Sequence, residues 1–425
     1  MNVLYPLVLF LYAVLELPKY LWRRVIHGRY RGLFRQRLGF LPREVADSGA
    51  HSPIWIHAVS VGEAQVARSL VAQLNERHPN RRIVISTITD TGREIARGIP
   101  GVNATFYLLL DFGWCVRKSI ALVNPSLVIL IENEIWPTLT RELRKQGIPI
   151  VMVNGRVSDG SFPKYRMVAR WLKPIFDRVG AFLVQTSRDA ERFAEIGAPK
   201  ERIEVLGSLK FDANQVGERP DLREKWRGIL GISDDTILIV AGSTYPGEEE
   251  ILTRVLAEVS RKKVVRMILA PRRPERFDEV AALMDDAGMT YVRRSEIERS
   301  SGKEPVILLD KMGELSSVYA AADIAFVGKS LRGFGGQNPL EPACLGIPVV
   351  FGPHTENFRE MAEILLACGN SIQVNNEAEL PTVLKRWIDD PEFRQTCGQS
   401  AIAVLGQHTG AAGRTVIRLE ELGFL

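Results

Sequence analysis

Short runs of β-branched and other apolar residues alternate with amphipathic segments from residue 54 onward. In the first half of the chain the runs are IWIHAVS, RRIVIST, ATFYLLL, SLVILIE, IPIVMVN and AFLVQT, and segments of helical period such as EAQVARSLVAQLNERH separate them. Near-continuous apolar strands that alternate with helices are typical of a parallel sheet covered on both faces. The pattern predicts a doubly wound α/β domain that ends near Leu209.

The alternation stops at the polar segment FDANQVGERPDLREKW, which we interpret as a linker because it lacks a core pattern. It resumes with TILIVAGST, KVVRMILAP, EPVILLD, DIAFVGKS and IPVVFGP, which predict a second doubly wound domain. We therefore expect domains over 44–212 and 213–425, with the helices after about Pro381 as candidates for packing back on the first domain. Ligands of open α/β sheets bind outside the carboxyl ends of the strands, so two facing domains predict an interdomain cleft.

The first 43 residues have a different character. VLYPLVLFLYAVLELP is apolar apart from Glu16, and residues 19–43 hold eight Lys or Arg and no acidic residue. Such a basic segment attracts anionic lipid headgroups, at about 1 kcal/mol per charge near the surface. The apolar run is shorter than the roughly 20 residues of a full span, and no signal-peptide cleavage site is visible. We expect residues 1–43 to be a membrane anchor with a cytoplasmic basic flank; a buried first helix is the alternative.

Composition excludes several classes of protein. The 425 residues are 46% hydrophobic and 25% charged, as in soluble globular proteins, and the length suggests two domains. The four cysteines form no CxxC pair and the six histidines no HxxxH pair, so we expect reduced thiols, no metal and no cofactor. No nucleic-acid-binding motif accompanies the formal charge of +5.

Several polar residues follow the predicted strands of the first domain. Gly62 and Glu63 come after IWIHAVS, where the glycine would permit a tight turn and the carboxylate could either stabilise a helix N-terminus or accept a proton. Glu132 and Glu134 end SLVILIE, and one or both could instead cap the next helix. Lys210 follows another strand and could neutralise a phosphate, or be a solvated linker lysine.

The second domain carries two basic or glycine-rich segments after strands. Pro271, Arg272 and Arg273 would present planar guanidinium groups to a phosphate, or form a basic surface turn. In residues 328–353 the backbone N–H groups of Gly333, Gly335 and Gly336 could bind an anion, at the positive end of a helix expected to start near Asn338. Glu341, one turn into that helix, could accept hydrogen bonds from ribose. The spacing is neither GxGxxG nor GxxxxGK[ST], so it indicates neither dinucleotide nor P-loop chemistry.

Taken in order, these segments resemble the 3-deoxy-D-manno-octulosonic acid (Kdo) transferases of lipopolysaccharide assembly. The motifs that carry the resemblance are HAVSVGE, IENEIWP, NGRVS, GSLKFD, PRRPERF, KMGEL, FVGKSL, GGQNPLEP and GPHTENF. They span nearly the whole chain and are specific in combination. The resemblance implies the GT-B fold of two Rossmann-like domains and metal-independent, inverting transfer of Kdo from CMP-Kdo to the lipid A precursor (lipid IVA). It also implies a place at the cytoplasmic side of the inner membrane.

Residue roles follow from the resemblance position by position. Glu63 matches the family's general base, and Glu132 and Lys210 match positions that stabilise the transition state. The CMP-binding segments correspond to Pro271 and Arg272, to Met312, Gly313 and Glu314, and to Asn338, Pro339, Leu340 and Glu341. Some members have glycine where Lys329 stands, and the loop LRGFGGQN varies among relatives.

Two other functions remain open at this stage. A transferase that uses a UDP-sugar would share the predicted cleft and glycine loop. A membrane-tethered two-lobed binding protein would share the architecture but would not need a carboxylate such as Glu63. The number of Kdo residues added, the acylation of the acceptor, the oligomeric state and the depth of membrane insertion do not follow from the sequence.

Overall fold

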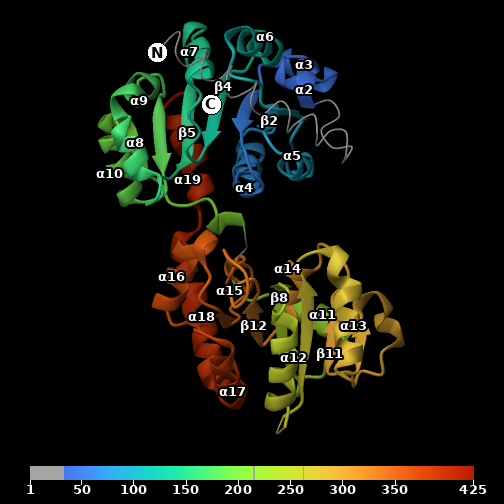
Figure 1. Cartoon of the computed structure of the whole chain (residues 1–425). Coiled ribbons are helices and arrows are strands. Elements are labelled where there is room, and N and C mark those ends of the chain that lie inside the picture. Colours follow the sequence, from blue (N-terminus) through green and yellow to red (C-terminus); the bar gives the residue numbers. More distant parts are fainter. Residues whose placement is uncertain (1–32, 214–215, 262) are drawn as a thin grey trace. The chain divides into compact units, whose positions relative to one another are not determined.

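The computed structural model describes residues 33–213, 216–261 and 263–425. Two compact units divide the chain: one comprises the described residues up to Ala213 together with His408–Leu425, and the other comprises Asn214–Gln407. Each unit contains a seven-stranded sheet in which all paired strands run parallel. The prediction of two doubly wound α/β domains is therefore confirmed (Figure 1).

The first sheet has the strand order β3-β2-β1-β4-β5-β6-β7. Its strands are β1 (Ile54–His57), β2 (Ile83–Thr87), β3 (Ala104–Tyr107), β4 (Leu127–Ile131), β5 (Ile150–Gly155), β6 (Ala181–Val184) and β7 (Ile203–Val205). The helices of this unit are α2 (Leu33–Arg37), α3 (Arg43–Gly49), α4 (Val61–Arg77), α5 (Asp90–Arg97), α6 (Gly113–Val123), α7 (Pro137–Lys145), α8 (Phe162–Met167), α9 (Ala169–Phe176), α10 (Ser187–Glu195) and α19 (Ala411–Glu421).

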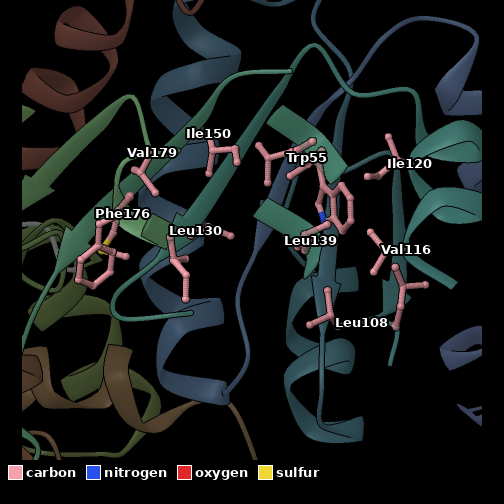
Figure 2. Packing of buried hydrophobic residues seen from close by; sticks show 14 of the residues in the cluster. Trp55, Leu108, Val116, Ile120, Leu130, Leu139, Ile150, Phe176 and Val179 are labelled. Carbon is pink, nitrogen blue, oxygen red and sulfur yellow. The ribbon is translucent and has the colours of Figure 1, made fainter. Parts of the chain in front are cut away.

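Both faces of the first sheet are buried, which explains why its strands are continuous apolar runs. On one face Trp55, Val84 and Val128 pack against residues of α3, α6, α7, α9 and α10. Figure 2 shows members of this cluster from strands together with members from helices, such as Val116 and Ile120. The opposite face, with alternate residues of the same strands, packs against α4, α5 and α19.

The last helix of the chain belongs to the first unit. Figure 1 shows α19, coloured red, among that unit's elements. Ala411, Val416 and Leu419 are fully buried in the cluster on the α4 side of the sheet. The Asp212 carboxylate holds the start of α19 by accepting hydrogen bonds from the backbone N–H groups of Gly410 (2.6 Å) and Ala412 (2.5 Å).

The second sheet has the strand order β10-β11-β9-β8-β12-β13-β14. Its strands are β8 (Ile237–Thr244), β9 (Val265–Pro271), β10 (Tyr291–Arg293), β11 (Val306–Leu308), β12 (Ile324–Val327), β13 (Val349–Phe351) and β14 (Ser371–Gln373). Its helices are α11 (Pro220–Ile229), α12 (Glu248–Val259), α13 (Phe277–Asp286), α14 (Leu315–Val318), α15 (Leu340–Ala343), α16 (Arg359–Ala367), α17 (Leu380–Asp389) and α18 (Pro391–His408). Residues of α12, α13 and α17 pack on one face of this sheet.

Two expectations about the second unit are only partly right. The segment interpreted as a linker forms α11 from Pro220 onward: Trp226 is buried, and Arg227 donates to the Asp323 carboxylate at 3.3 Å and to the Ala321 carbonyl at 3.1 Å. The helix expected to start near Asn338 is present as α15, which begins at Leu340 but is only a single turn long. It ends early because Gly346 adopts a left-handed backbone (φ +75°) two residues after its C-cap.

The expected membrane anchor falls mostly outside the described residues, because its apolar run lies within residues 1–32. In the part of the chain that the structure describes, no helix has both the length and the apolar character needed to cross a bilayer.

Candidate active site

In each sheet the chain crosses once from one half of the sheet to the other, and we call this the reversal point. In the first unit this point lies between the neighbouring strands β1 and β4, and in the second between β8 and β12. Crevices outside the carboxyl ends of strands at such points are the usual ligand sites of doubly wound sheets. Glu63 follows β1 and Glu132 follows β4, so the structure places both at the reversal point of the first sheet.

Glu63 lies in the first turn of α4 and takes part in a reciprocal cap. The Ser60 side chain accepts a hydrogen bond from the Glu63 N–H (3.3 Å) and donates one to Glu63 Oε1 (3.0 Å). Glu63 Oε2 accepts a hydrogen bond from the backbone N–H of Val59 at 2.6 Å. This Ser-x-x-Glu arrangement is a variant of the capping box, in which the glutamate accepts from the N–H of Val59, one residue before the N-cap. The carboxylate therefore does stabilise the helix start, and these contacts also hold it in one orientation at the strand end.

Glu63 also has the electrostatics of a proton acceptor. Burial raises the pKa of its carboxyl from 4.5 to about 7, and the negative charges of Glu134 and Glu132 raise it further, against the hydrogen bonds from Val59 and Ser60. A general base is most effective when its pKa is close to the working pH. The capping contacts occupy one acceptor position on each oxygen, and a carboxylate has further lone pairs for a substrate hydroxyl.

Gly62 does not have the role that we expected. It is an exposed residue inside α4 without a positive φ, and a Cβ built there would meet only Ser60 Oγ, at 3.9 Å. The turn from β1 into α4 therefore does not require glycine at this position.

Glu132 and Lys210 form an ion pair beside Glu63. Lys210 Nζ lies 2.9 Å from Glu132 Oε1, and both side chains are about three-quarters buried. Glu132 has a left-handed backbone (φ +61°), an unfavourable conformation for a residue with a side chain and one that is common at functional sites. Lys210 is positioned by its neighbour Leu209, whose N–H donates to Asn154 Oδ1 at 2.9 Å.

The Glu134 carboxylate contacts other side chains of the first unit. Its Oε2 accepts a hydrogen bond from Trp136 Nε1 at 2.8 Å and lies 3.8 Å from Nε2 of the fully buried His57. His57 Nδ1 in turn lies 2.8 Å from Ser86 Oγ. Glu134 thus joins β1 to the start of α7, and its charge acts on Glu63 from a distance.

In the second unit, the predicted CMP-binding residues lie at the carboxyl ends of β9, β11 and β12. Arg272 is exposed directly after β9. Burial raises the pKa of Glu341, whereas the Asn338 amide, which donates to it at 3.4 Å, and the charge of Arg272 lower it. Pro339 and Leu340 are buried next to these residues.

The predicted CMP-binding residues after β11 are Met312, Gly313 and Glu314. Met312 is 57% exposed and Gly313 has a positive φ of 86°. Glu314 Oε2 lies 3.0 Å from Arg294 Nε, so this carboxylate is already paired. Of this segment, the exposed Met312 and the backbone of Gly313 are the groups most accessible to a ligand.

Two of the three glycines in the glycine loop use their backbone N–H groups for hydrogen bonds within the protein. All three glycines have left-handed backbones, but the Gly335 N–H donates to Glu356 Oε2 (2.9 Å) and the Gly336 N–H to the Lys329 carbonyl (3.1 Å). A Cβ on Gly336 would meet the His354 carbonyl oxygen at 2.6 Å. The expectation that these N–H groups bind an anion is therefore wrong for Gly335 and Gly336, which fold the loop instead.

Sequence reasoning missed Glu248, the residue that holds this loop. Its fully buried carboxylate accepts hydrogen bonds from the backbone N–H groups of Tyr245, Lys329, Ser330, Leu331 and Arg332, at 2.7–3.2 Å. Three successive glutamates begin α12, and nothing in their order distinguishes the one that turns inward. Ser60 was also missed, although its spacing to Glu63 is a recognisable capping signal.

A cavity of about 400 Å³ opens between the carboxyl ends of β8, β9 and β12. It lies at the reversal point of the second sheet, where a ligand is expected. Its lining residues are Thr244, Tyr245, Pro246, Arg272, Arg273, Arg276, Lys329 and Gln337. In the described residues no group of three or more His, Cys, Asp or Glu is placed to hold a metal ion.

Comparison with known proteins identifies the family. Residues 33–213 match the family described as 3-deoxy-D-manno-octulosonic-acid transferase (kdotransferase). The transferase of that name from Haemophilus influenzae is 34% identical over 393 residues, which cover 91% of this chain and 90% of the relative. This chain belongs to the 3-deoxy-D-manno-octulosonic acid transferase family. The one from Chlamydophila psittaci is 31% identical over 416 residues, covering 97% and 94% of the two chains.

Solved structures agree with the fold of this Kdo transferase family member. Anabaena Alr3699/HepE in complex with UDP is 15% identical with a TM-score of 0.57, over 88% of this chain and all of that one. UDP-GlcNAc 2-epimerase from Neisseria meningitidis is 12% identical with the same TM-score, over 87% of this chain and all of that one. At these identities the likeness concerns the fold alone, two parallel-sheet α/β domains of the GT-B-like kind.

The raised pKa of Glu63 predicts a pH-dependent stability of the first unit. Because the folded state holds the proton more tightly than the unfolded state, this contribution is complete below about pH 4.5 and is lost as the pH rises through about 7. Relative to Glu63→Gln, the wild type should lose up to about 3 kcal/mol of unfolding free energy across this range. Hydrogen exchange of the β1 amides, compared between variants at each pH, reports the first unit alone.

Glu76→Gln is the matched control, because Glu76 lies exposed near the other end of the same helix. It should follow the wild type at every pH. An identical pH dependence for the wild type and Glu63→Gln would show that the Glu63 pKa is not raised by folding.

Proposed function

We propose that this glycosyltransferase moves Kdo from CMP-Kdo to the lipid A precursor (lipid IVA) in lipopolysaccharide assembly. The observation that carries the proposal is Glu63: a buried, oriented carboxyl with a pKa of about 7, beside the Glu132–Lys210 ion pair at the reversal point of a doubly wound sheet. Membership of the Kdo transferase family supplies the sugar that is transferred.

In the proposed mechanism an acceptor hydroxyl attacks the anomeric carbon of Kdo while its proton passes to Glu63. The new oxygen–carbon bond forms as the bond from that carbon to the phosphate oxygen breaks, and the electron pair of the broken bond leaves with CMP. A single displacement of this kind inverts the anomeric configuration. A positioned general base typically contributes 10²- to 10⁴-fold to the rate. Removing the Glu63 carboxylate should therefore lower the transfer rate strongly and leave CMP binding unchanged.

Charge stabilisation falls to other residues. The anomeric carbon gains oxocarbenium character as the bond to CMP breaks, and the Glu132 carboxylate, held at 2.9 Å by Lys210, can stabilise positive charge or orient the acceptor. In the second unit the exposed guanidinium of Arg272 is suited to the phosphate of CMP. Cations preorganised around developing charge can supply several kcal/mol, which is the basis for proposing a reaction without a metal.

The exposed surface of α8 and α9 supports a place for the protein at the anionic surface of the inner membrane. Met167 is 83% exposed and Trp171 is 51% exposed, and the guanidinium of Arg170 lies 4.7 Å from the Trp171 ring centre. Exposed apolar and aromatic side chains beside cations are typical of surfaces that bind anionic lipids. We propose that this surface acts with the basic N-terminal segment at the cytoplasmic side, where the lipid acceptor is found.

The catalytic proposal predicts the behaviour of Glu63→Ala. The variant should lose at least about 100-fold in transfer rate while binding CMP as the wild type does, because the base touches the acceptor and not the nucleotide. The measurement is incubation with CMP-Kdo and tetraacylated lipid A precursor, followed by mass spectrometry of the products. Wild-type product masses also identify the donor, the acceptor and the number of sugars added. Near wild-type turnover of Glu63→Ala would show that Glu63 is not the general base.

The donor proposal predicts that Arg272→Ala weakens CMP binding. Loss of a charge-assisted contact to the phosphate should reduce the affinity roughly tenfold, as measured by calorimetry. Arg299→Ala serves as the control, since this exposed arginine pairs, among the described residues, only with Glu296 three positions earlier. The wild type should bind CMP more tightly than UDP; equal affinity for both, or no change in Arg272→Ala, would contradict the proposed donor site.

The membrane proposal predicts that the double variant Met167→Glu, Trp171→Glu binds less to vesicles of anionic phospholipid. Each added carboxylate is repelled by the lipid headgroups and each lost apolar side chain removes insertion energy. Val264→Glu is the control, because Val264 is 63% exposed in the other unit. Co-sedimentation of the double variant at the wild-type level would exclude this surface from membrane binding.

A further inference from the structure

The cavity at the carboxyl ends of β8, β9 and β12 contains more positive charge than one phosphate diester requires. Four of its lining side chains are cations, Arg272, Arg273, Arg276 and Lys329, and none is acidic. Arg276 and Lys329 are partly buried and Arg272 and Arg273 are exposed, and like charges gathered around one cavity attract anionic ligands. The excess therefore points to a second anionic group in the ligand.

Two of the four cations are partly balanced by the protein. Arg276 pairs with Glu249 at 2.7 Å and with Glu279 at 2.8 Å, and Arg272 is close enough to Glu341 for their charges to interact. Over the described ranges, no carboxylate forms an ion pair with Arg273 or Lys329. These two residues carry the uncompensated charge.

Lys329 is also held in an unusual backbone conformation. Its φ is +56°, in the left-handed region where glycine is favoured and a residue with a Cβ is disfavoured by roughly 1 kcal/mol. Its N–H donates to Glu248 at 2.7 Å and its carbonyl accepts from Gly336 at 3.1 Å, so both adjoining peptide groups are fixed. Unfavourable backbone conformations that the surroundings enforce are concentrated at ligand sites.

The Lys329 side chain is directed by its packing. Its Nζ lies 5.9 Å from the ring centre of Tyr245, within the range of a cation–π contact. A Cβ on Gly333 would meet the Tyr245 ring at 3.1 Å and Lys329 Cγ at 3.3 Å, so the glycine leaves room for the lysine stem. The ammonium group is thereby held in the lining of the cavity.

We propose that Lys329, together with Arg273, forms a subsite for the carboxylate of the sugar acid in the donor, next to the phosphate position at Arg272. The inference rests on the proposed function. In a CMP-linked 2-keto sugar acid the anomeric carbon bears both the carboxylate and the phosphate oxygen, so the two anions are neighbours. Their cations must be neighbours too, as Arg272, Arg273 and Lys329 are around one cavity. In this chain the subsite strengthens binding of a sugar-acid donor relative to a neutral-sugar donor.

The test compares two ligands, CMP and CMP-Kdo, each bound without acceptor and measured by calorimetry. Lys329→Gly should bind CMP within about twofold of the wild type and CMP-Kdo roughly tenfold more weakly, because only the second ligand has the carboxylate. Lys329→Arg should restore most of the CMP-Kdo affinity. Arg332→Ala is the matched control: it removes a cation of the same loop that pairs with Glu377, outside the cavity lining, and should change neither affinity.

The thermal stability of the Lys329 variants shows whether Lys329 acts on the ligand or on the fold. Glycine adopts the backbone of Lys329 without strain, so Lys329→Gly should unfold at the wild-type temperature or above it. Lys329→Asn, whose side chain also tolerates a left-handed backbone, gives the same affinity comparison in a second background.

Three results would overturn the inference or its premise, and they are distinguishable. Equal losses for CMP and CMP-Kdo would place Lys329 at the phosphate. Unchanged CMP-Kdo affinity in both Lys329→Gly and Lys329→Asn would exclude the subsite. Failure of the wild type to bind either ligand would instead contradict the proposed function, whatever the variants do.

Discussion

A parallel sheet that is buried on both faces confines polar chemistry to its edges, and this constraint determines where the site of this Kdo transferase family member lies. Apolar side chains fill both faces of the first sheet, Trp55 and its neighbours on one side and residues of α4 and α19 on the other, and the buried His57 on β1 is hydrogen-bonded to Ser86. The loops after the strands are where side chains such as Glu63 and Glu132 can be partly desolvated without disrupting the core. Partial desolvation raises the pKa of Glu63 to the range of a useful base.

The two units have a glutamate at an equivalent position but use it for different purposes. In each, a glutamate in the first turn of the helix after the central strand turns toward the strand ends: Glu63 after β1 and Glu248 after β8. Glu248 accepts five backbone hydrogen bonds and has no remaining capacity for a ligand, so it organises the loop that carries Lys329. In the part of the chain that the structure describes, Glu63 has only Val59 and Ser60 as donors, and two carboxylates lie nearby. The difference in the number of donors separates a structural carboxylate from the one that we propose as the general base.

The architecture could be predicted from the sequence because long apolar strands and amphipathic helices are strong local signals. Three edge strands, β7, β10 and β14, were missed because each has three residues and is only partly buried, so no apolar run marks it. α11 was missed because its stability depends on distant partners: Arg223 and Arg227 bind Asp323. In the candidate site, the sequence could predict Glu63, Glu132 and Lys210, because each lies just after a strand and matches a residue of the family that it resembles. The internal hydrogen bonds of Gly335 and Gly336 could not be predicted, because a glycine-rich loop that binds an anion and one that folds on itself have the same composition.

The return of the last helix to the first unit has a consequence for synthesis on the ribosome. α19 supplies Ala411, Val416 and Leu419 to the cluster that covers one side of the first sheet, but Asn214–Gln407, the entire second unit, is translated before it. At about 5 to 20 residues per second, those 194 residues take roughly 10 to 40 s. Throughout that interval the nascent first unit has an uncovered apolar strip along α4 and its sheet. This strip is covered only after α19 has been translated, so the core of the first unit closes later than the core of the second.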